Sequence, residues 1–120
     1  MIGFSSLVSA TDVANGPSLL VSVEANANGA GNVYVIDGTQ KKSITLEVGV
    51  NYIFNHSTDH PLRFSVTPDG THGGGMEYAQ GVYTYNPGRT EIEVHSETPT
   101  TLYYYCSIHP GMGGSITISG

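Results

Sequence analysis

The most informative segment of the chain is Tyr103-Tyr-Tyr-Cys106-Ser-Ile-His109-Pro-Gly-Met112-Gly-Gly. Cys106 is the only cysteine, and His109 and Met112 follow it at intervals of three residues. Side chains alternate between two faces along a straight strand, so this spacing requires a turn if the three are to converge. The proline and the glycines of the segment supply residues that form tight turns. The segment therefore predicts a strand, residues 101–106, that ends at Cys106 and is followed by a turn.

The side chains of this segment are typical of one class of metal site. A thiolate, an imidazole and a thioether form a mixed soft and borderline ligand set that suits copper. The set needs a second histidine, and His60 is the best candidate because residues 62–66 after it read as a strand. Two histidines, one cysteine and a weak axial methionine make a blue-copper electron-transfer site. We therefore predict copper, cycling between Cu(II) and Cu(I), with four ligands: His60, Cys106, His109 and Met112.

Other metals and other side chains compete with this interpretation. Structural zinc sites more often use cysteine and histidine than methionine, so Met112 favours copper. A single cysteine taken alone is usually a small buried hydrophobic residue, and it is the spacing of His109 and Met112 that favours a ligand role for Cys106. Met76 is an alternative axial donor, although we expect it to fill an irregular part of the core.

The remaining histidines are less suitable as copper ligands. His56 lies in a polar turn and lacks a following apolar strand to hold its ring. His72 lies in the glycine-rich segment 69–75, where we expect it to cap the loop or face solvent, with an adventitious second metal as the alternative. His95 ends a predicted strand and should point outward.

Residues 102–118 resemble the C-terminal copper loop and last strand of the cupredoxins, the group that includes plastocyanin, amicyanin and pseudoazurin. The two-residue gaps on both sides of His109 are more similar to the short amicyanin-type loop than to the plastocyanin loop. His60 and the Pro-Leu-Arg-Phe after it resemble the strand that begins with the first histidine ligand. The resemblance covers about residues 31–120, and several segments are also similar to cupredoxin-like modules of marine bacteria and phages.

The chain departs from the cupredoxin pattern at one position. Cupredoxins commonly carry an asparagine beside the first histidine, which bonds toward the serine or threonine after the cysteine. Ser107 retains one half of that contact, but His60 is flanked by Asp59 and Pro61. Hydrogen bonds behind metal ligands fix their orientation. The departure leaves open how the two ligand segments are held together.

Composition and periodicity predict an all-β protein. The chain has 120 residues with 16 glycines, 8 tyrosines and 12% charged residues, and good helix formers are scarce. Short alternating segments divided by Gly, Pro, Asn and Asp are typical of a sandwich or barrel, and the resemblance implies a Greek-key β-sandwich with about 8–9 strands. The expected strands are residues 19–24, 32–36, 43–48, 51–54, 62–66, 81–85, 90–95, 101–106 and 115–119.

The length fits a single domain. Residues 1–30 are expected to form an N-terminal strand or arm and a connector, and residues 31–120 the cupredoxin-like copper-binding domain. Because aromatic residues on strands usually pack inward, we expect four tyrosines in the core, namely Tyr34, Tyr52, Tyr83 and Tyr104. Tyr103 and Tyr105 are expected to shape the surface near the site.

Charge and hydropathy limit the partners. A net charge of −6 with four lysines and arginines argues against nucleic acid. The same charge favours a basic redox partner protein through electrostatic steering, or serves only solubility. No apolar segment approaches the ~20 residues of a membrane span, and residues 1–10 lack the basic start of a signal peptide. We expect a monomer. If a leader has been removed, we expect it in the periplasm, outside the cell or on a virion; the alternative is a module that stays in the cytoplasm.

The sequence thus predicts a mononuclear type-1 copper protein that transfers single electrons and is not an enzyme. No His-x-His pair is present to build further copper centres, and the turn offers no catalytic context for a thiol enzyme. The alternative is a structural, display or copper-sequestering module, in which the bound metal stabilises the fold. Reversible redox cycling distinguishes the two hypotheses.

Overall fold

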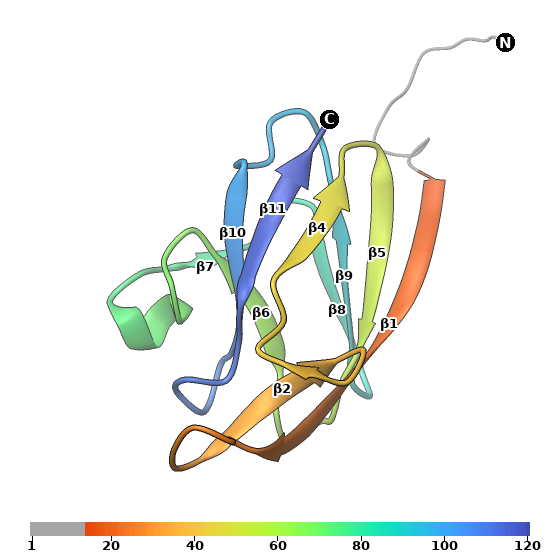
Figure 1. The fold of residues 1–120 in the computed structure, drawn as a ribbon. Helices are drawn as coiled ribbons and strands as arrows, with labels where there is room; N and C mark the ends of the chain where they lie inside the picture. The colour runs from red at the N-terminus through yellow and green to blue at the C-terminus, as the bar shows by residue number, and fades with distance from the viewer. Residues whose placement is uncertain (1–13) are drawn as a thin grey trace, which may run out of the picture.

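A computed structural model of the protein describes residues 14–120 (Figure 1). The elements in chain order are β1 (Ala14–Ala25), β2 (Asn32–Ile36), β3 (Thr39–Gln40), β4 (Ile44–Glu47), β5 (Val50–Asn55), β6 (Leu62–Ser65), the 3-10 turn η2 (Gly70–Gly73), β7 (Glu77–Tyr78), β8 (Val82–Tyr85), β9 (Arg89–Glu93), β10 (Thr101–Cys106) and β11 (Ser115–Ser119). They form a six-stranded sheet in the order β3-β2-β1-β5-β9-β8 and a five-stranded sheet in the order β4-β11-β10-β6-β7. The predicted all-β sandwich is confirmed.

All nine predicted strands are present, with ends that differ by a few residues. The sequence did not predict β3 and β7, because a two-residue strand is too short to show a periodic pattern. It also predicted β1 too short. Gly16 and Pro17 usually end a strand, but here they lie where the register with β5 shifts between Asn15 and Ser18. A bulge tolerates both residue types, so the strand continues through them.

The pairing of β1 places the N-terminal part of the described chain within the sandwich. β1 runs parallel to β5 along residues 14–20 and antiparallel to β2 along residues 21–25. The predicted N-terminal arm therefore includes a strand of the six-stranded sheet, and its residues 1–13 lie outside the described residues. The division of the chain at residue 30 stays a prediction.

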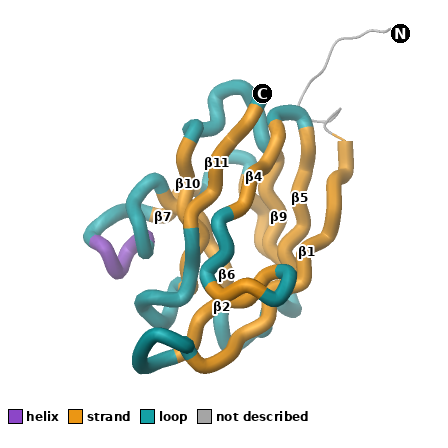
Figure 2. Tube along the Cα trace, in the orientation of Figure 1, coloured by secondary structure: helices purple, strands orange, loops and turns teal. Residues whose placement is uncertain are grey.

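The five-stranded sheet sets the position of Cys106. β10 is its central strand, with β11 on one side and β6 on the other (Figure 2). β10 pairs with β6 so that Cys106 lies opposite Leu62. Both strands reach the end of the sandwich that lies away from the C-terminus in Figure 1, so the loops after β10 and before β6 lie beside each other there.

The core between the sheets is apolar and aromatic. Phe54 from one sheet and Phe64 from the other pack edge to face with ring centroids 5.4 Å apart, an arrangement that aromatic rings favour. Of the four tyrosines expected in the core, three are buried: Tyr34, Tyr52 and Tyr104. Burial therefore confirms the prediction at those three positions.

Two tyrosine predictions are wrong. Tyr83 is 45% exposed, because β8 is the edge strand of its sheet and few neighbours cover it. Tyr105, expected at the surface, is only 1% exposed. The turn at η2 covers it, since Gly70 lies directly against its ring.

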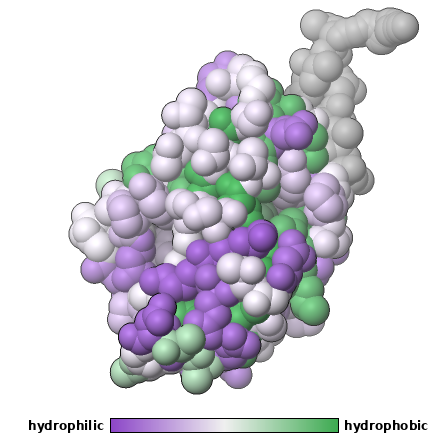
Figure 3. Space-filling model, viewed as in Figure 1, coloured by the Kyte–Doolittle hydropathy of each residue, from purple (hydrophilic) through white to green (hydrophobic). Residues whose placement is uncertain are grey.

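The face drawn in Figure 3 is mainly pale and hydrophilic, with hydrophobic residues in separate small areas. Among residues 14–120, no helix is long and apolar enough to cross a membrane.

Candidate metal centre

The pairing of β6 with β10 brings His60 to the end of the strand that carries Cys106. His60 comes two residues before Leu62, the residue paired with Cys106. The backbone N–H of Ser107 donates to the carbonyl of Pro61 at 3.0 Å, which continues the pairing one step beyond the strands. This backbone hydrogen bond joins the two predicted ligand segments without the asparagine that cupredoxins commonly carry.

The structure brings His60, Cys106 and His109 into one cluster. The Sγ atom of Cys106 lies 3.9 Å from Nδ1 of His60 and 3.7 Å from Nδ1 of His109. All three donor atoms lie within 4.8 Å of one another, and the centroids of the two imidazole rings are also 4.8 Å apart. Cys106 is buried, His60 is half-buried and His109 is exposed. Within residues 14–120, no other group of three or more His, Cys, Asp or Glu donors is close enough to hold a metal ion.

The distances from the sulfur to the two imidazoles suit a metal ion. Typical metal bonds are about 2.3 Å to a thiolate and about 2.0–2.1 Å to an imidazole, as measured for zinc. With those bonds, one ion could join the sulfur to an imidazole nitrogen 3.7 or 3.9 Å away, at a sulfur–metal–nitrogen angle of roughly 115–130°. One thiolate and two imidazoles are the equatorial donor set of a blue-copper site. The chemistry of the residues present therefore fits a copper ion.

Met112 lies beside this cluster. Its side chain is fully buried, and it lines a pocket of about 360 Å³ together with His60 and His109. Its carbonyl accepts a hydrogen bond from the backbone N–H of Tyr34 at 2.9 Å, which ties the end of the loop to β2. Met76, in contrast, is 81% exposed, so its expected role in the core is wrong.

Tyr34 lies behind the cluster, although sequence patterns predicted only a packing role for it. Its hydroxyl donates to the carbonyl of His60 at 2.6 Å. Burial raises the pKa of the Tyr34 phenol well above its ordinary value, and the nearby Cys106 side chain adds to the rise. No sequence pattern could reveal this contact, because β2 is far from both ligand segments along the chain.

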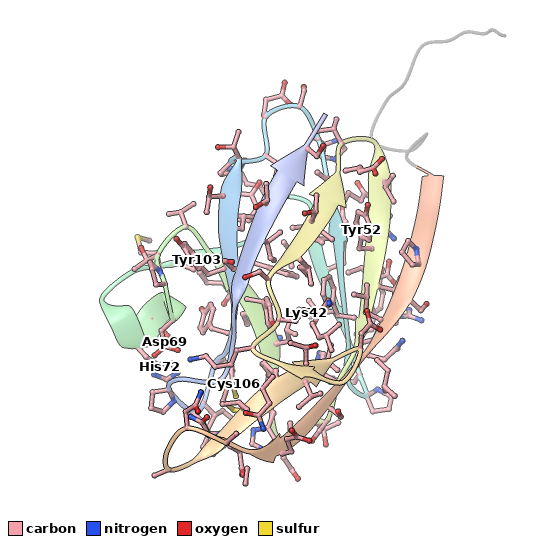
Figure 4. All side chains as sticks on the ribbon, in the orientation of Figure 1. Lys42, Tyr52, Asp69, His72, Tyr103 and Cys106 are labelled. Atoms are coloured by element: carbon pink, nitrogen blue, oxygen red, sulfur yellow. The ribbon has the colours of Figure 1, made fainter. Side chains whose placement is uncertain are left out.

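The turn at η2 contacts the loop of residues 106–112 from outside (Figure 4). Nε2 of His72 lies 2.8 Å from the carbonyl oxygen of Cys106. The two carboxylate oxygens of Asp69 accept from the backbone N–H of Gly111 at 2.9 and 3.1 Å. His72 is exposed, which is one of the two expectations for it, and the group that its ring contacts is the carbonyl of a predicted ligand, outside its own loop. The sequence singled out no role for Asp69.

The other two histidines have partners away from the cluster. Nε2 of His56 lies 2.8 Å from the hydroxyl of Thr90, and its Nδ1 lies 3.0 Å from the carbonyl of Ser57. Burial lowers the pKa of His56. His95 is partly exposed and its Nε2 lies 3.4 Å from Oε1 of Glu93. These positions agree with the expectation that neither belongs to the centre.

Comparison with known proteins gives a remote structural likeness. No protein-family model and no curated protein matches the chain. A rusticyanin structure from Thiobacillus ferrooxidans is 16% identical, with 94% of this chain and 84% of that chain covered and a TM-score of 0.43. A reduced rusticyanin is 20% identical, with coverages of 86% and 80% and a TM-score of 0.41.

Three features of the chain come together at one end of the sandwich. The fold is a two-sheet all-β sandwich. Its central strand β10 ends in a buried cysteine, and two histidines from separate loops turn their nitrogens toward the sulfur of that cysteine. This combination of fold and donor set is the one that the resemblance of the sequence implied. The chain therefore resembles the cupredoxins in its fold and in its donor set.

Proposed function

We propose that this protein holds one copper ion as a type-1 centre and carries single electrons between redox partner proteins. The observation that carries the proposal is the close approach of one buried cysteine sulfur to two imidazole nitrogens, at 3.7 and 3.9 Å. His60, Cys106 and His109 would be the equatorial ligands, and Met112 the weak axial ligand. Copper bound in this way supplies a one-electron couple between Cu(II) and Cu(I).

The surroundings of the donors suit electron transfer with little rearrangement. The Cys106 sulfur is fully buried, which keeps water away from it. Backbone hydrogen bonds at Ser107 and Met112 hold both ends of the loop that carries His109. Such support keeps ligands in one orientation and tunes the metal they bind. Donors held in this way would keep one geometry in both oxidation states of a bound copper.

His109 is placed where a partner protein can approach. It is exposed, and its neighbour Ile108 is 58% exposed, so the imidazole is next to apolar surface. The net charge of −6 favours a partner with a basic surface, because opposite charges accelerate encounter. We propose a brief contact at this end of the sandwich.

The test is to add one equivalent of Cu(II) to the metal-free protein, record visible and electron paramagnetic resonance spectra, and then reduce with ascorbate and reoxidise. We expect an intense thiolate-to-copper band that bleaches and returns. Cys106→Ser should abolish the band. His56→Gln is the control that should retain it, because the His56 ring bonds to Thr90 outside the cluster.

The other outcomes separate the alternatives. A colourless product with an ordinary tetragonal copper signal, or a band that survives in Cys106→Ser, would overturn the site. An intense band that forms but does not return after reduction would favour a structural or copper-sequestering module over an electron carrier.

A further inference from the structure

The turn around η2 holds both ends of the 106–112 loop. At the start of the loop, the carbonyl of Cys106 lies 2.8 Å from Nε2 of His72. Near its end, the backbone N–H of Gly111 donates to both carboxylate oxygens of Asp69. Figure 4 shows Asp69 and His72 on the side of the turn that faces Cys106. Two side chains of one short turn thus contact the two ends of one loop.

The backbone of Asp69 is in a conformation that costs free energy. Its φ is 61°, in the left-handed region that residues other than glycine rarely adopt. Such a conformation persists only where the surrounding structure enforces it, and it often marks a functional position. The bond from Gly111 to the carboxylate is charge-assisted and therefore among the stronger hydrogen bonds. It offsets the unfavourable backbone conformation of Asp69.

The turn is packed tightly enough to act as a fixed support. A side chain at Gly70 would collide with the ring of Tyr105, and one at Gly73 would collide with the carbonyl of Pro68. Backbone bonds close the turn, from the N–H of Gly70 to the carbonyl of Thr67 at 2.9 Å and from the N–H of Gly75 to the carbonyl of Gly70 at 3.0 Å. The turn therefore rests directly on β10, the strand that carries Cys106.

We infer that Asp69 and His72 are positioning residues that hold the 106–112 loop in its metal-ready shape before any metal binds. Gly111 lies between His109 and Met112, so fixing its backbone fixes the direction of both side chains. His72 holds the backbone at the Cys106 end of the loop through the carbonyl of Cys106. The inference rests on the proposed function only for the identity of the metal.

The first experiment needs no metal. Amide hydrogen exchange of the metal-free protein, measured by nuclear magnetic resonance, reports the opening of the Gly111 amide. Asp69→Gly removes the acceptor and relaxes the left-handed backbone, so the variant keeps its fold. We expect Gly111 to exchange about tenfold faster in Asp69→Gly, as expected for loss of a hydrogen bond to a charged group. Asp69→Asn keeps one acceptor oxygen and should show a smaller increase.

Asp37 provides a matched control. It also has a left-handed backbone, with φ of 51°, and lies in the turn between β2 and β3. Within the described residues its side chain makes no hydrogen bond to the 106–112 loop. Asp37→Gly therefore relaxes the same kind of backbone without touching the loop, and Gly111 should exchange as in the unmodified protein. Equal exchange of Gly111 in Asp69→Gly and Asp37→Gly would overturn the inference.

The second experiment measures Cu(II) affinity by chelator competition, together with the visible spectrum. Asp69→Gly and His72→Ala should each lower the affinity about tenfold and shift the thiolate-to-copper band, because loss of support behind ligands typically has effects of this size. Asp69→Asn should recover part of the loss, and Asp37→Gly should match the unmodified protein. Unchanged affinity and spectrum in both loop variants would contradict the inference.

The two experiments distinguish the two proposals. If the unmodified protein forms no thiolate-to-copper band, the proposed function fails, and the exchange of Gly111 still decides whether Asp69 holds the loop. If the band forms and cycles but Gly111 is unaffected by Asp69→Gly, the proposed function stands and the positioning role is wrong.

Discussion

Replacing Tyr34 with phenylalanine removes one hydroxyl group from behind the candidate metal centre and changes little else. The hydroxyl donates to the carbonyl of His60 at 2.6 Å, and the Tyr34 ring is fully buried. The phenylalanine ring can keep the packing against Tyr104, whose ring centroid lies 6.1 Å away. The substitution therefore tests one hydrogen bond rather than the core.

The expected cost follows from the fate of the carbonyl of His60. A buried acceptor that loses its partner costs about 1–3 kcal/mol, and because His60 is only half-buried, water offsets part of that cost, so we expect about 1–2 kcal/mol. The unfolding entropy of a 120-residue protein is about 250 cal/mol/K, at roughly 2.1 cal/mol/K per residue. The melting temperature of the metal-free protein should therefore fall by roughly 4–8 °C.

Tyr104→Phe is the matched control. The Tyr104 hydroxyl donates to the carbonyl of Lys42 at 2.8 Å, away from the cluster, and burial raises the pKa of this phenol as it does that of Tyr34. Both variants should lose similar stability by calorimetry. Only Tyr34→Phe should change the copper-loaded protein, with a shifted thiolate band and a shifted reduction potential, because its hydroxyl holds the backbone of His60, and hydrogen bonds behind metal ligands tune the metal.

Two results would refute this reasoning. A loss below about 0.5 kcal/mol in Tyr34→Phe would mean that water or another donor satisfies the carbonyl of His60. Equal spectral shifts in the two variants would mean that the Tyr34 hydroxyl has no special relation to the cluster.

Three further predictions concern single positions. Met112→Leu conserves volume at a buried site, so the free energy of unfolding should fall by less than about 1.5 kcal/mol in a denaturant titration. The reduction potential of the copper-loaded protein, measured by voltammetry, should rise because a donor is lost. An unchanged potential would exclude Met112 as axial ligand. Burial lowers the pKa of His56 from 6.5, so below that pH the unfolded state binds more protons than the folded state. The stability that His56 contributes is therefore complete above pH 6.5 and is lost as the pH falls below it. In urea titrations, the free energy of unfolding should fall less between pH 7.5 and 5.5 in His56→Gln than in the unmodified protein. Gly113→Ala would direct a methyl group into the carbonyl of Tyr104, so we expect a loss of about 1–3 kcal/mol in thermal unfolding, and an unchanged melting temperature would contradict the packing described.

Sequence patterns predicted the strands well, but they did not predict the hydrogen bonds that support the candidate metal centre. The strands from β4 to β6 and from β9 to β11 have alternating apolar residues, and those patterns predicted them within a few residues. The same patterns predicted the exposure of individual side chains less reliably. Tyr83 and Met76 have apolar side chains that are 45% and 81% exposed, because burial depends on whether another element covers a residue and not on its own chemistry.

The residues of the candidate site also divide into those that local patterns predicted and those that they did not. His109 was predictable from its spacing after Cys106, because residues at short separation meet through one local turn. Met112, predicted from the same spacing, lines a pocket with His60 and His109. His60 required the additional expectation that it precedes a strand. Tyr34 and Asp69 carried no signal, since each reaches the cluster through hydrogen bonds to backbone atoms of a distant segment. Such bonds place no demand on the residue type of the partner.

The sequence by itself determined the class of fold and the chemical character of the donor set, because both depend on side-chain type and on short intervals along the chain. Only the tertiary structure decided which histidine of the distant segments joins Cys106, how the two ligand segments are linked without an asparagine, and which turn supports the 106–112 loop. Those outcomes depend on strand register and on loop packing. The free energy that sets register comes from the whole core, so no local pattern contains it.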